Sequence, residues 1–399
     1  MQRVVLLGLV FLAVTPDAAA EPEHASLFDV LRESTASVDL RYRYEWVSDD
    51  AVGLDGHAST LRTALRYETG AYEGFGVFLE AENISSVGAA LYNNAGVAHL
   101  GNGRLDRPVV ADPELTHMNQ AALRYTRQGT TVHVGRQEIL LDDQRFVGNV
   151  GWRQNHQSFD AVRVESSDVP GTTVNYAFIR GVHGIRGGAI PVSSQVLNAA
   201  FAVHAAARVV GYAYGIGNED DPRRSTNTWG VEVSGRPAGD DGGVLYEVEY
   251  ARQRAAARNP LRIAASYLHL MAGAEARGIV VTAGWERLGG NPADGQFNTP
   301  LATLHPFNGW ADRFLVTPAA GLEDTYLSVR GTVSAVQWSA TYHDFRSDAG
   351  RLRYGDEVDF ELRFVAPWRQ TIAIKAALYD ADAHATDVAK LMLWSAVRF

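Results

Sequence analysis

The chain of 399 residues contains no cysteine, so disulfides and thiolate metal sites are excluded. Small secreted domains usually depend on disulfides, whereas a closed β-barrel does not, because each of its strands is hydrogen-bonded on both edges. Positive charge is also scarce: 36 Lys and Arg face 46 Asp and Glu, for a net charge of −10. Nucleic-acid binding needs a basic surface, so that class of partner is excluded.

Long apolar runs are missing except at the beginning of the chain. Arg3, the apolar run 4–14 and the small residues 18–20 before Glu21 predict a secretory signal peptide over residues 1–20. The run is short for a membrane helix, and a retained anchor is the alternative. We therefore expect a mature chain that begins near Glu21 with a periplasmic segment over 21–36.

No later segment resembles a membrane helix, and no Pro- or Ser-rich linker divides the rest of the chain. Although the length would suit two or three soluble domains, we interpret residues 37–399 as one domain. A membrane protein without helical spans has to be a closed β-barrel.

Apolar and polar residues alternate with period two along most of the chain. In the segment 38–46 one parity is apolar and the other is charged, which places the charges on one face of a strand. The sequence predicts an all-β fold, a transmembrane antiparallel β-barrel of about 18 strands. The expected strands are 37–47, 59–69, 74–85, 117–127, 130–137, 157–166, 172–181, 194–204, 207–217, 227–236, 243–253, 263–273, 278–287, 323–332, 334–345, 356–365, 370–380 and 388–399.

The connections alternate between short turns and longer loops. The long ones are expected over 86–116, 138–156, 182–193 and 288–322. Short turns on the periplasmic side and longer loops on the extracellular side are typical of outer-membrane barrels. Aromatic residues on the apolar parity fall near both strand ends, as the two girdles of such a barrel do.

The last segment, 391–399, alternates and ends in Phe399. It is similar to the terminal strand by which the outer-membrane assembly machinery recognises its clients. Trp394 is an exception, because its parity places it in the lumen.

Catalytic motifs are lacking: there is no Gly-x-Ser-x-Gly elbow, no His-Glu-x-x-His and no phosphate-binding glycine loop. We interpret His343-Asp344 as part of the lumen lining rather than a catalytic pair. Acidic pairs such as Asp142-Asp143 could hold Ca²⁺, but they lack the ligand spacing of a calcium loop, so we interpret them as solvated charge. We expect no enzyme, no metal and no cofactor.

The lumen parity carries charges of both signs. Arginines gather in the first two strands, while Glu247 and Glu249 mark an acidic wall farther along the chain. Basic rings select anions and acidic rings select cations. Opposite charges on neighbouring strands could instead pair and only rigidify the barrel, and the sequence leaves both interpretations open.

Two long connections are rich in arginine and aromatic residues, and we expect both to fold into the lumen. Arginine suits carboxylates and aromatic faces suit sugar rings, although loop packing without ligand binding is the alternative. From one strand–loop–strand unit, Arg136, Arg145, Arg153 and Arg163 are expected to converge on one side of the lumen. The other expected residues of the ion and substrate path are Arg41, Arg43, Arg62, Arg66 and Arg363. The expected loop constriction consists of Trp152, His305 and Trp310.

At these two connections the sequence resembles the alginate export family, which includes the alginate secretion channel of pseudomonads. The resemblance rests on Gly-Arg-Gln at 135–137, Arg-Phe-Val-Gly at 145–148, Trp-Arg-Gln at 152–154, and the run from Thr299 to Asp312. It implies an eighteen-stranded barrel with an arginine-lined constriction that passes an anionic polyuronate. Here acidic residues accompany the arginines, so the resemblance supports the family more firmly than the cargo.

We therefore expect a channel in the outer membrane of a Gram-negative bacterium, used for diffusion or export of anionic saccharides or small acidic solutes. The expected partners are the lipid bilayer, that solute and the outer-membrane assembly machinery. A general or cation-preferring porin is the alternative within transport. A barrel hydrolase or adhesin is the alternative from another class, because fold does not fix function.

Overall fold

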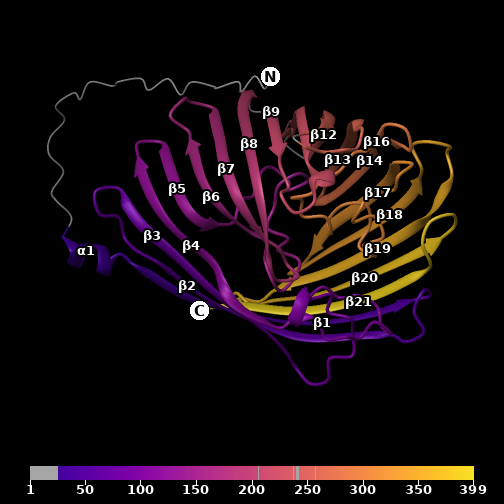
Figure 1. Cartoon of the computed structure of the whole chain (residues 1–399), viewed down its shortest axis with the longest axis horizontal. Coiled ribbons are helices and arrows are strands. Elements are labelled where there is room, and N and C mark those ends of the chain that lie inside the picture. The colour runs from indigo at the N-terminus through magenta and orange to yellow at the C-terminus, as the bar shows by residue number, and fades with distance from the viewer. Residues whose placement is uncertain (1–25, 205, 237, 240–241, 257) are drawn as a thin grey trace.

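A computed structural model describes residues 26–204, 206–236, 238–239, 242–256 and 258–399 (Figure 1). The predicted signal peptide, residues 1–20, and the start of the segment 21–36 lie outside these residues. Within them the chain forms one large antiparallel sheet that closes on itself, and a separate two-stranded sheet.

The sheet contains eighteen long strands within the described residues, as predicted. In chain order these are β1 (Thr35–Asp49), β2 (Gly56–Glu68), β3 (Phe75–Ser86), β4 (Leu115–Arg127), β5 (Thr130–Gln137), β6 (Ser158–Ser166), β7 (Thr172–His183), β8 (Ala189–His204), β9 (Ala207–Ile216), β10 (Thr226–Gly235), β12 (Gly242–Ala255), β13 (Ala264–Ala276), β14 (Ile279–Leu288), β17 (Leu322–Val333), β18 (Val336–Arg346), β19 (Arg353–Val365), β20 (Thr371–Ala381) and β21 (Val388–Arg398). The minor elements are α1 (Leu27–Arg32), η1 (Ala98–Leu100), η2 (Pro222–Arg224), β11 (Ala238–Gly239), β15 (Gly290–Asn291) and β16 (Gly295–Gln296).

Each long strand pairs with its neighbours in the chain, and β1 closes the barrel by pairing with both β2 and β21. In the β1–β21 ladder, Arg43 lies opposite Trp394 and Trp46 opposite Leu391. Among the described residues, closure leaves none of the eighteen long strands at a free edge, which is what a bilayer without hydrogen-bonding water requires. Figure 1 shows the wall curving from β1 through β8 and back to β21.

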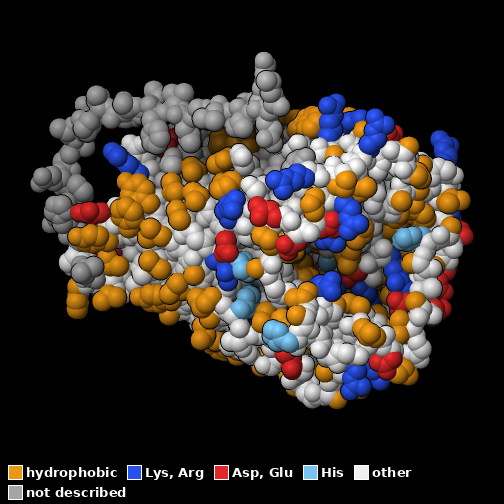
Figure 2. Space-filling model, in the orientation of Figure 1, with side chains coloured by type: hydrophobic (Ala, Val, Ile, Leu, Met, Phe, Trp, Pro, Cys, Tyr) orange, Lys and Arg blue, Asp and Glu red, His pale blue; other side chains and the backbone are white. Residues whose placement is uncertain are grey.

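The two faces of the wall differ as the alternation predicts. Outward side chains such as Leu65 (55% exposed) and Tyr250 (48% exposed) face the surroundings, whereas the inward Arg43 and Glu45 are each 1% exposed. Figure 2 shows hydrophobic side chains over the outside of the wall at the left, where β2 to β5 lie. The charged side chains of the lumen are buried because connections between the strands fold into the barrel, as described below.

One expected connection is wrong. A loop was predicted over 182–193, but β7 and β8 continue to pair until only 184–188 remains as a turn. Pairing extends past an irregularity at Ile179 and Gly181, and Gly187 and Gly188 adopt the positive φ angles of the tight turn. Small residues blur the alternation here, so the sequence pattern understated β8.

Helix α1 begins with a capping box between Ser26 and Asp29 and lies against the β2–β3 turn, where Gly70 N donates to Val30 O at 3.2 Å. In the part of the chain that the structure describes, no helix is long and apolar enough to cross a membrane.

The C-terminal residue is tied to the first strand. Phe399 exchanges two backbone hydrogen bonds with Val38, at 3.0 and 3.1 Å, and its ring is 73% exposed. Deleting Phe399 should reduce the assembled barrel in the outer membrane several-fold, because both bonds and an interfacial aromatic anchor are lost. The heat-modifiable band in membrane fractions measures this, Phe399→Tyr is the matched control, and normal levels of the deletion variant would contradict the assignment.

Candidate functional site

Two connections meet in the middle of the lumen: residues 138–157, between β5 and β6, and residues 289–321, between β14 and β17. Val147 and Leu301 form a parallel bridge, and Gly148 N donates to Leu301 O at 2.9 Å. The buried Gln157 amide donates to the carbonyls of Gly148 and Leu301 at 2.9 and 3.1 Å. Both loops fold inward, as expected, and satisfy their backbone groups inside the barrel.

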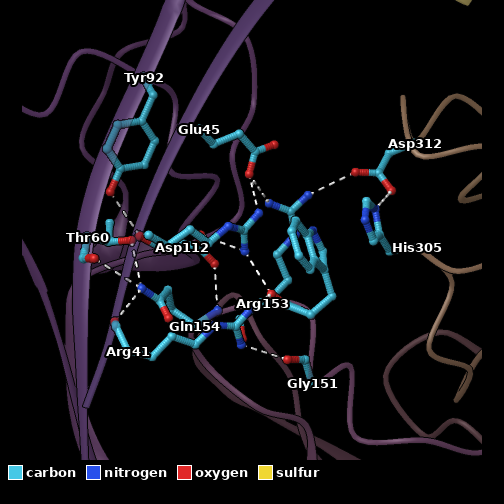
Figure 3. Close-up of polar contacts among 12 residues, drawn as sticks. Arg41, Glu45, Thr60, Tyr92, Asp112, Gly151, Arg153, Gln154, His305 and Asp312 are labelled. Atoms are coloured by element: carbon cyan, nitrogen blue, oxygen red, sulfur yellow. Dashed lines mark hydrogen bonds and ion pairs between the residues drawn. The ribbon is translucent and has the colours of Figure 1, made fainter. Parts of the chain in front are cut away.

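A third connection, 87–114 between β3 and β4, also reaches the lumen, which the sequence did not indicate. Asp112 is 1% exposed, accepts a hydrogen bond from Gln154 N at 2.9 Å, and its carbonyl accepts one from the Tyr92 hydroxyl (Figure 3). The only available signal was the apolar run 108–110 before it, which marks a packed segment rather than a solvated loop.

Arg41 and Arg43 extend from β1 to the tip of the 138–157 loop. The Arg41 guanidinium donates to the carbonyls of Gly151 and Trp152 at 2.8 and 2.7 Å (Figure 3). Arg43 donates to Trp152 O at 2.8 Å, pairs with Glu45, and holds its guanidinium carbon 4.1 Å from the centre of the Trp152 ring. These two arginines therefore hold the loop in place.

Arg153 and Asp312 join the two loops to each other and to the wall. Arg153 lies 3.4 Å from Glu45 and 3.0 Å from Asp312, and Lys390 of β21 lies 2.7 Å from Asp312. Burial alone would raise the pKa of Asp312, but Lys390, His305 and Arg153 hold that pKa well below its usual value. Asp312 is therefore a buried, ionised carboxylate that contacts Arg153, His305 and Lys390.

Arg145 forms a second anchor, on a different part of the wall. It is 2% exposed and donates to Glu286 of β14 at 2.6 Å and to Asn308 at 2.9 Å. Burial opposes its charge, but the neighbouring Glu286 carboxylate raises the pKa of Arg145 above its ordinary value.

The four arginines of the 135–163 unit do not converge on one side, so that expectation is wrong. The loop crosses the lumen: Arg145 contacts β14 and Arg153 contacts β1, while Arg136 and Arg163 remain on β5 and β6. Of the nine arginines expected in the path, all but Arg41 have a carboxylate within 4.0 Å among the described residues. The remaining pairs are Arg62–Glu82, Arg66–Glu80, Arg136–Asp160 (2.9 Å), Arg163–Glu165 (2.6 Å) and Arg363–Glu361 (2.9 Å).

The expected loop aromatics form a stacked layer. The Trp152 and His305 rings are parallel with centroids 4.3 Å apart, and Trp310 follows at 6.3 Å from His305. Trp394 packs its edge against Trp152 at 5.4 Å, which explains why the terminal strand carries a tryptophan on its lumen parity.

Lys375 of β20 enters this layer, and sequence reasoning missed it although it stands on the lumen parity of its strand. Its ammonium nitrogen lies 3.7 Å from the Trp310 ring centre, 4.6 Å from that of Trp152 and 3.5 Å from His305 Nε2. No carboxylate of the described residues lies within 4.0 Å of it. Burial, opposed by Asp312 and reinforced by Lys375, lowers the pKa of His305 to about 3, so the imidazole is neutral.

Cavities lie on both sides of this layer. The outer one, about 520 Å³, is bounded by Trp152, His305 and the 184–188 turn. The other, about 540 Å³, lies toward the periplasmic turns and is bounded by Trp310, Arg330 and Arg363. The aromatic layer therefore separates two solvent spaces of similar size.

The acidic wall expected from Glu247 and Glu249 is present. Glu232 of β10 lies opposite Glu249 of β12 in the ladder. Glu249 accepts a hydrogen bond from Tyr212 at 2.7 Å, and Glu247 pairs with His269 at 2.7 Å. Carboxylates thus outnumber arginines on this part of the lumen.

One group has the composition of a metal site. Ligand atoms of Glu80, Glu82, Glu138 and His156 lie within 4.8 Å of one another. Arg62 already reaches both Glu82 and Glu80, so the carboxylates have a counter-charge without an ion.

Comparison with known proteins agrees with this architecture. Residues 33–179 match the model of the alginate export family. No curated protein matches the sequence.

Solved structures match along nearly the whole chain. They include Pseudomonas aeruginosa OccK5 (OpdH), at 12% identity and TM-score 0.71, P. aeruginosa OpdK with vanillate, at 12% and 0.74, and Acinetobacter baumannii OccAB2, at 13% and 0.75. Each alignment covers 93% of this chain and 99% of the other. At such identities the likeness shows the fold alone. The chain therefore has the closed β-barrel fold of the Pseudomonas and Acinetobacter outer-membrane porins, with the sequence pattern of the alginate export family over residues 33–179.

Proposed function

We propose that this protein is a passive channel, not an enzyme, for small solutes that carry a carboxylate. The observation that supports this most strongly is Lys375, a buried cation with no carboxylate within 4.0 Å among the described residues, inside the layer that separates the two cavities. A fixed charge with no carboxylate in contact, in a narrow and low-dielectric passage, concentrates ions of the opposite sign.

Two further cations of the lumen lie on the same side of the barrel as Lys375. Arg41 of β1 binds only carbonyl groups, and Arg330 of β17 is exposed to the inner cavity; within the described residues neither has a carboxylate within 4.0 Å. Glu232, Glu247 and Glu249 lie on β10 and β12, half-way round the barrel from β1. A solute carboxylate would therefore pass Arg330, Lys375 and Arg41, the lumen cations named above.

The sizes of the cavities favour small acids over a polymer. Spaces of about 520 and 540 Å³ suit small organic molecules, and the two interlocked loops lie between them. OpdK, whose fold this chain shares, was solved with vanillate, an aromatic carboxylate.

We further propose that residues 1–20 are removed on export, that residues 21–36 lie in the periplasm, and that the assembly machinery receives the chain through its Phe399 strand. The amphiphilic alternation of β21 and its terminal aromatic residue support the last step.

The acidic wall favours a second candidate, a cation-preferring porin. If Glu247 and Glu249 outweigh Lys375, Arg41 and Arg330, small cations would pass more easily than anions.

The reversal potential under a salt gradient in a planar bilayer separates the two. We expect wild-type protein to prefer anions and Lys375→Gln to lower the anion-to-cation permeability ratio by roughly threefold. The control R398Q/D39N removes a positive charge together with the carboxylate that it pairs with at 2.7 Å, so the net charge is kept and the ratio should be unchanged. A wild-type potential that favours cations would overturn the anion proposal and support the second candidate.

A further inference from the structure

The chain has one strongly basic segment, although its overall charge is negative. Between residues 252 and 262 there are four arginines and no acidic residue. They are Arg252 and Arg254 at the end of β12, and Arg258 and Arg262 in the following loop, and three of the four are exposed.

Arg252 and Arg254 point outward from the barrel. They share the parity of Val248 and Tyr250, which are each 48% exposed, whereas the alternate positions Ala251 and Gln253 are fully buried toward the lumen. Their charge therefore lies on the outer surface and does not enter the permeation path.

These arginines stand at the aromatic girdle and just beyond it. Trp229 of β10 lies opposite Arg252 in the ladder, and the Arg254 guanidinium carbon lies 5.7 Å from the Trp229 ring centre. Trp229 and Tyr250 mark the membrane interface, so Arg252 is level with Trp229 and Arg254 lies two residues farther along the strand, roughly 7 Å toward the loop. That height is the level of lipid headgroups at the extracellular end, where β12 leads into the loop 256–263.

Three other exterior arginines at this end are already paired with carboxylates. Arg346 lies 2.8 Å from Asp344, Arg353 lies 2.7 Å from Asp356, and Arg287 lies 2.6 Å from Asp348. Within the described residues no carboxylate lies within 4.0 Å of any arginine of the 252–262 segment. Figure 2 shows Lys and Arg side chains gathered at the upper edge of the view, over β12 to β16.

We propose that Arg252 and Arg254, with Arg258 and Arg262 beside them, bind the phosphate groups of the glycolipid that forms the outer leaflet of the outer membrane. Arginine presents a planar fork that suits phosphate oxygens. These arginines have no carboxylate partner among the described residues and lie at the depth of the anionic headgroups, which attract basic side chains.

The test is binding of bis-phosphorylated lipid A to the full chain in detergent, measured by native mass spectrometry. The R252Q/R254Q variant should bind roughly 10- to 30-fold more weakly, as expected for the loss of two cations at a charged lipid surface. The matched control is R346Q/R353Q, which removes two exterior arginines that carboxylates already neutralise, and it should bind like wild type.

A second probe tests the phosphate specificity. Lipid A with one phosphate should bind wild-type protein more weakly than the bis-phosphorylated form. Equal binding of both lipids, or wild-type affinity in R252Q/R254Q, would overturn the proposal. The conductance and the heat-modifiable gel shift should be unchanged in both variants, which shows that the barrel is folded and separates this test from that of the channel.

Discussion

Deleting residues 299–316 from the β14–β17 connection is expected to raise the single-channel conductance several-fold. This segment supplies His305, Trp310 and Asp312, which form much of the layer between the two cavities. Its backbone is held by β19, where Trp310 N donates to Asp359 at 3.1 Å and Ala311 N donates to Glu357 at 2.6 Å. Removing it would join the outer and inner cavities. Conductance in planar bilayers measures the effect.

The control for this deletion is the exposed tip of the β3–β4 connection, residues 103–106, where Leu105 is 82% exposed. Replacing that tip with a short Gly-Ser turn should leave the conductance unchanged. If the 299–316 deletion gave a heat-modifiable barrel with wild-type conductance, the permeation path would lie outside this loop.

The barrel could be predicted from the sequence because the direction of each side chain depends only on its position along its own strand. A side chain's parity decides whether it faces lipid or lumen, so Val38 to Trp46 reveals a strand without any knowledge of its partners. Closure then follows, because a bilayer tolerates no open edge. The prediction was wrong only where alternation fades, as at Ala189 to Pro191 of β8.

The interior could be predicted only in part, because it depends on contacts between residues far apart in the chain. The sequence identified Arg145, Arg153 and the Trp152–His305–Trp310 group as lumen residues, and the structure places them there. It could not show that Arg153 meets Glu45 and Asp312, which lie 108 and 159 positions away. Because of such pairing, most of the arginines that were expected along the anion path form ion pairs with carboxylates.

A glycine illustrates the same limit. Gly309 has φ +83°, and a Cβ there would collide with the Glu357 carboxylate. The turn at Asn308-Gly309 therefore fits only against β19. The sequence Asn-Gly predicts a turn, but not the wall that it contacts.

The other large effect is expected at the ion pair of Arg145 and Glu286. Replacing Arg145 with Met would leave the buried Glu286 carboxylate, among the described residues, with the Tyr267 hydroxyl and the Asn308 amide as its donors. Losing one partner of a buried pair typically costs about 3–5 kcal/mol. Urea titration of the protein folded into lipid vesicles should show a loss of that size, and the 138–157 loop should become sensitive to protease.

The double variant R145M/E286L separates a structural role from a role in selectivity. Removing both charges replaces the pair with apolar side chains of similar volume, and such replacements are often close to neutral. We therefore expect the double variant to recover most of the lost stability, to within about 1–2 kcal/mol of wild type. Its reversal potential should also match wild type, because the pair contributes no net charge to the lumen. If the double variant were stable but had lost its anion preference, Arg145 would act on the permeating ion through its charge, and the anion path would run along β14 instead of along the wall that carries Lys375.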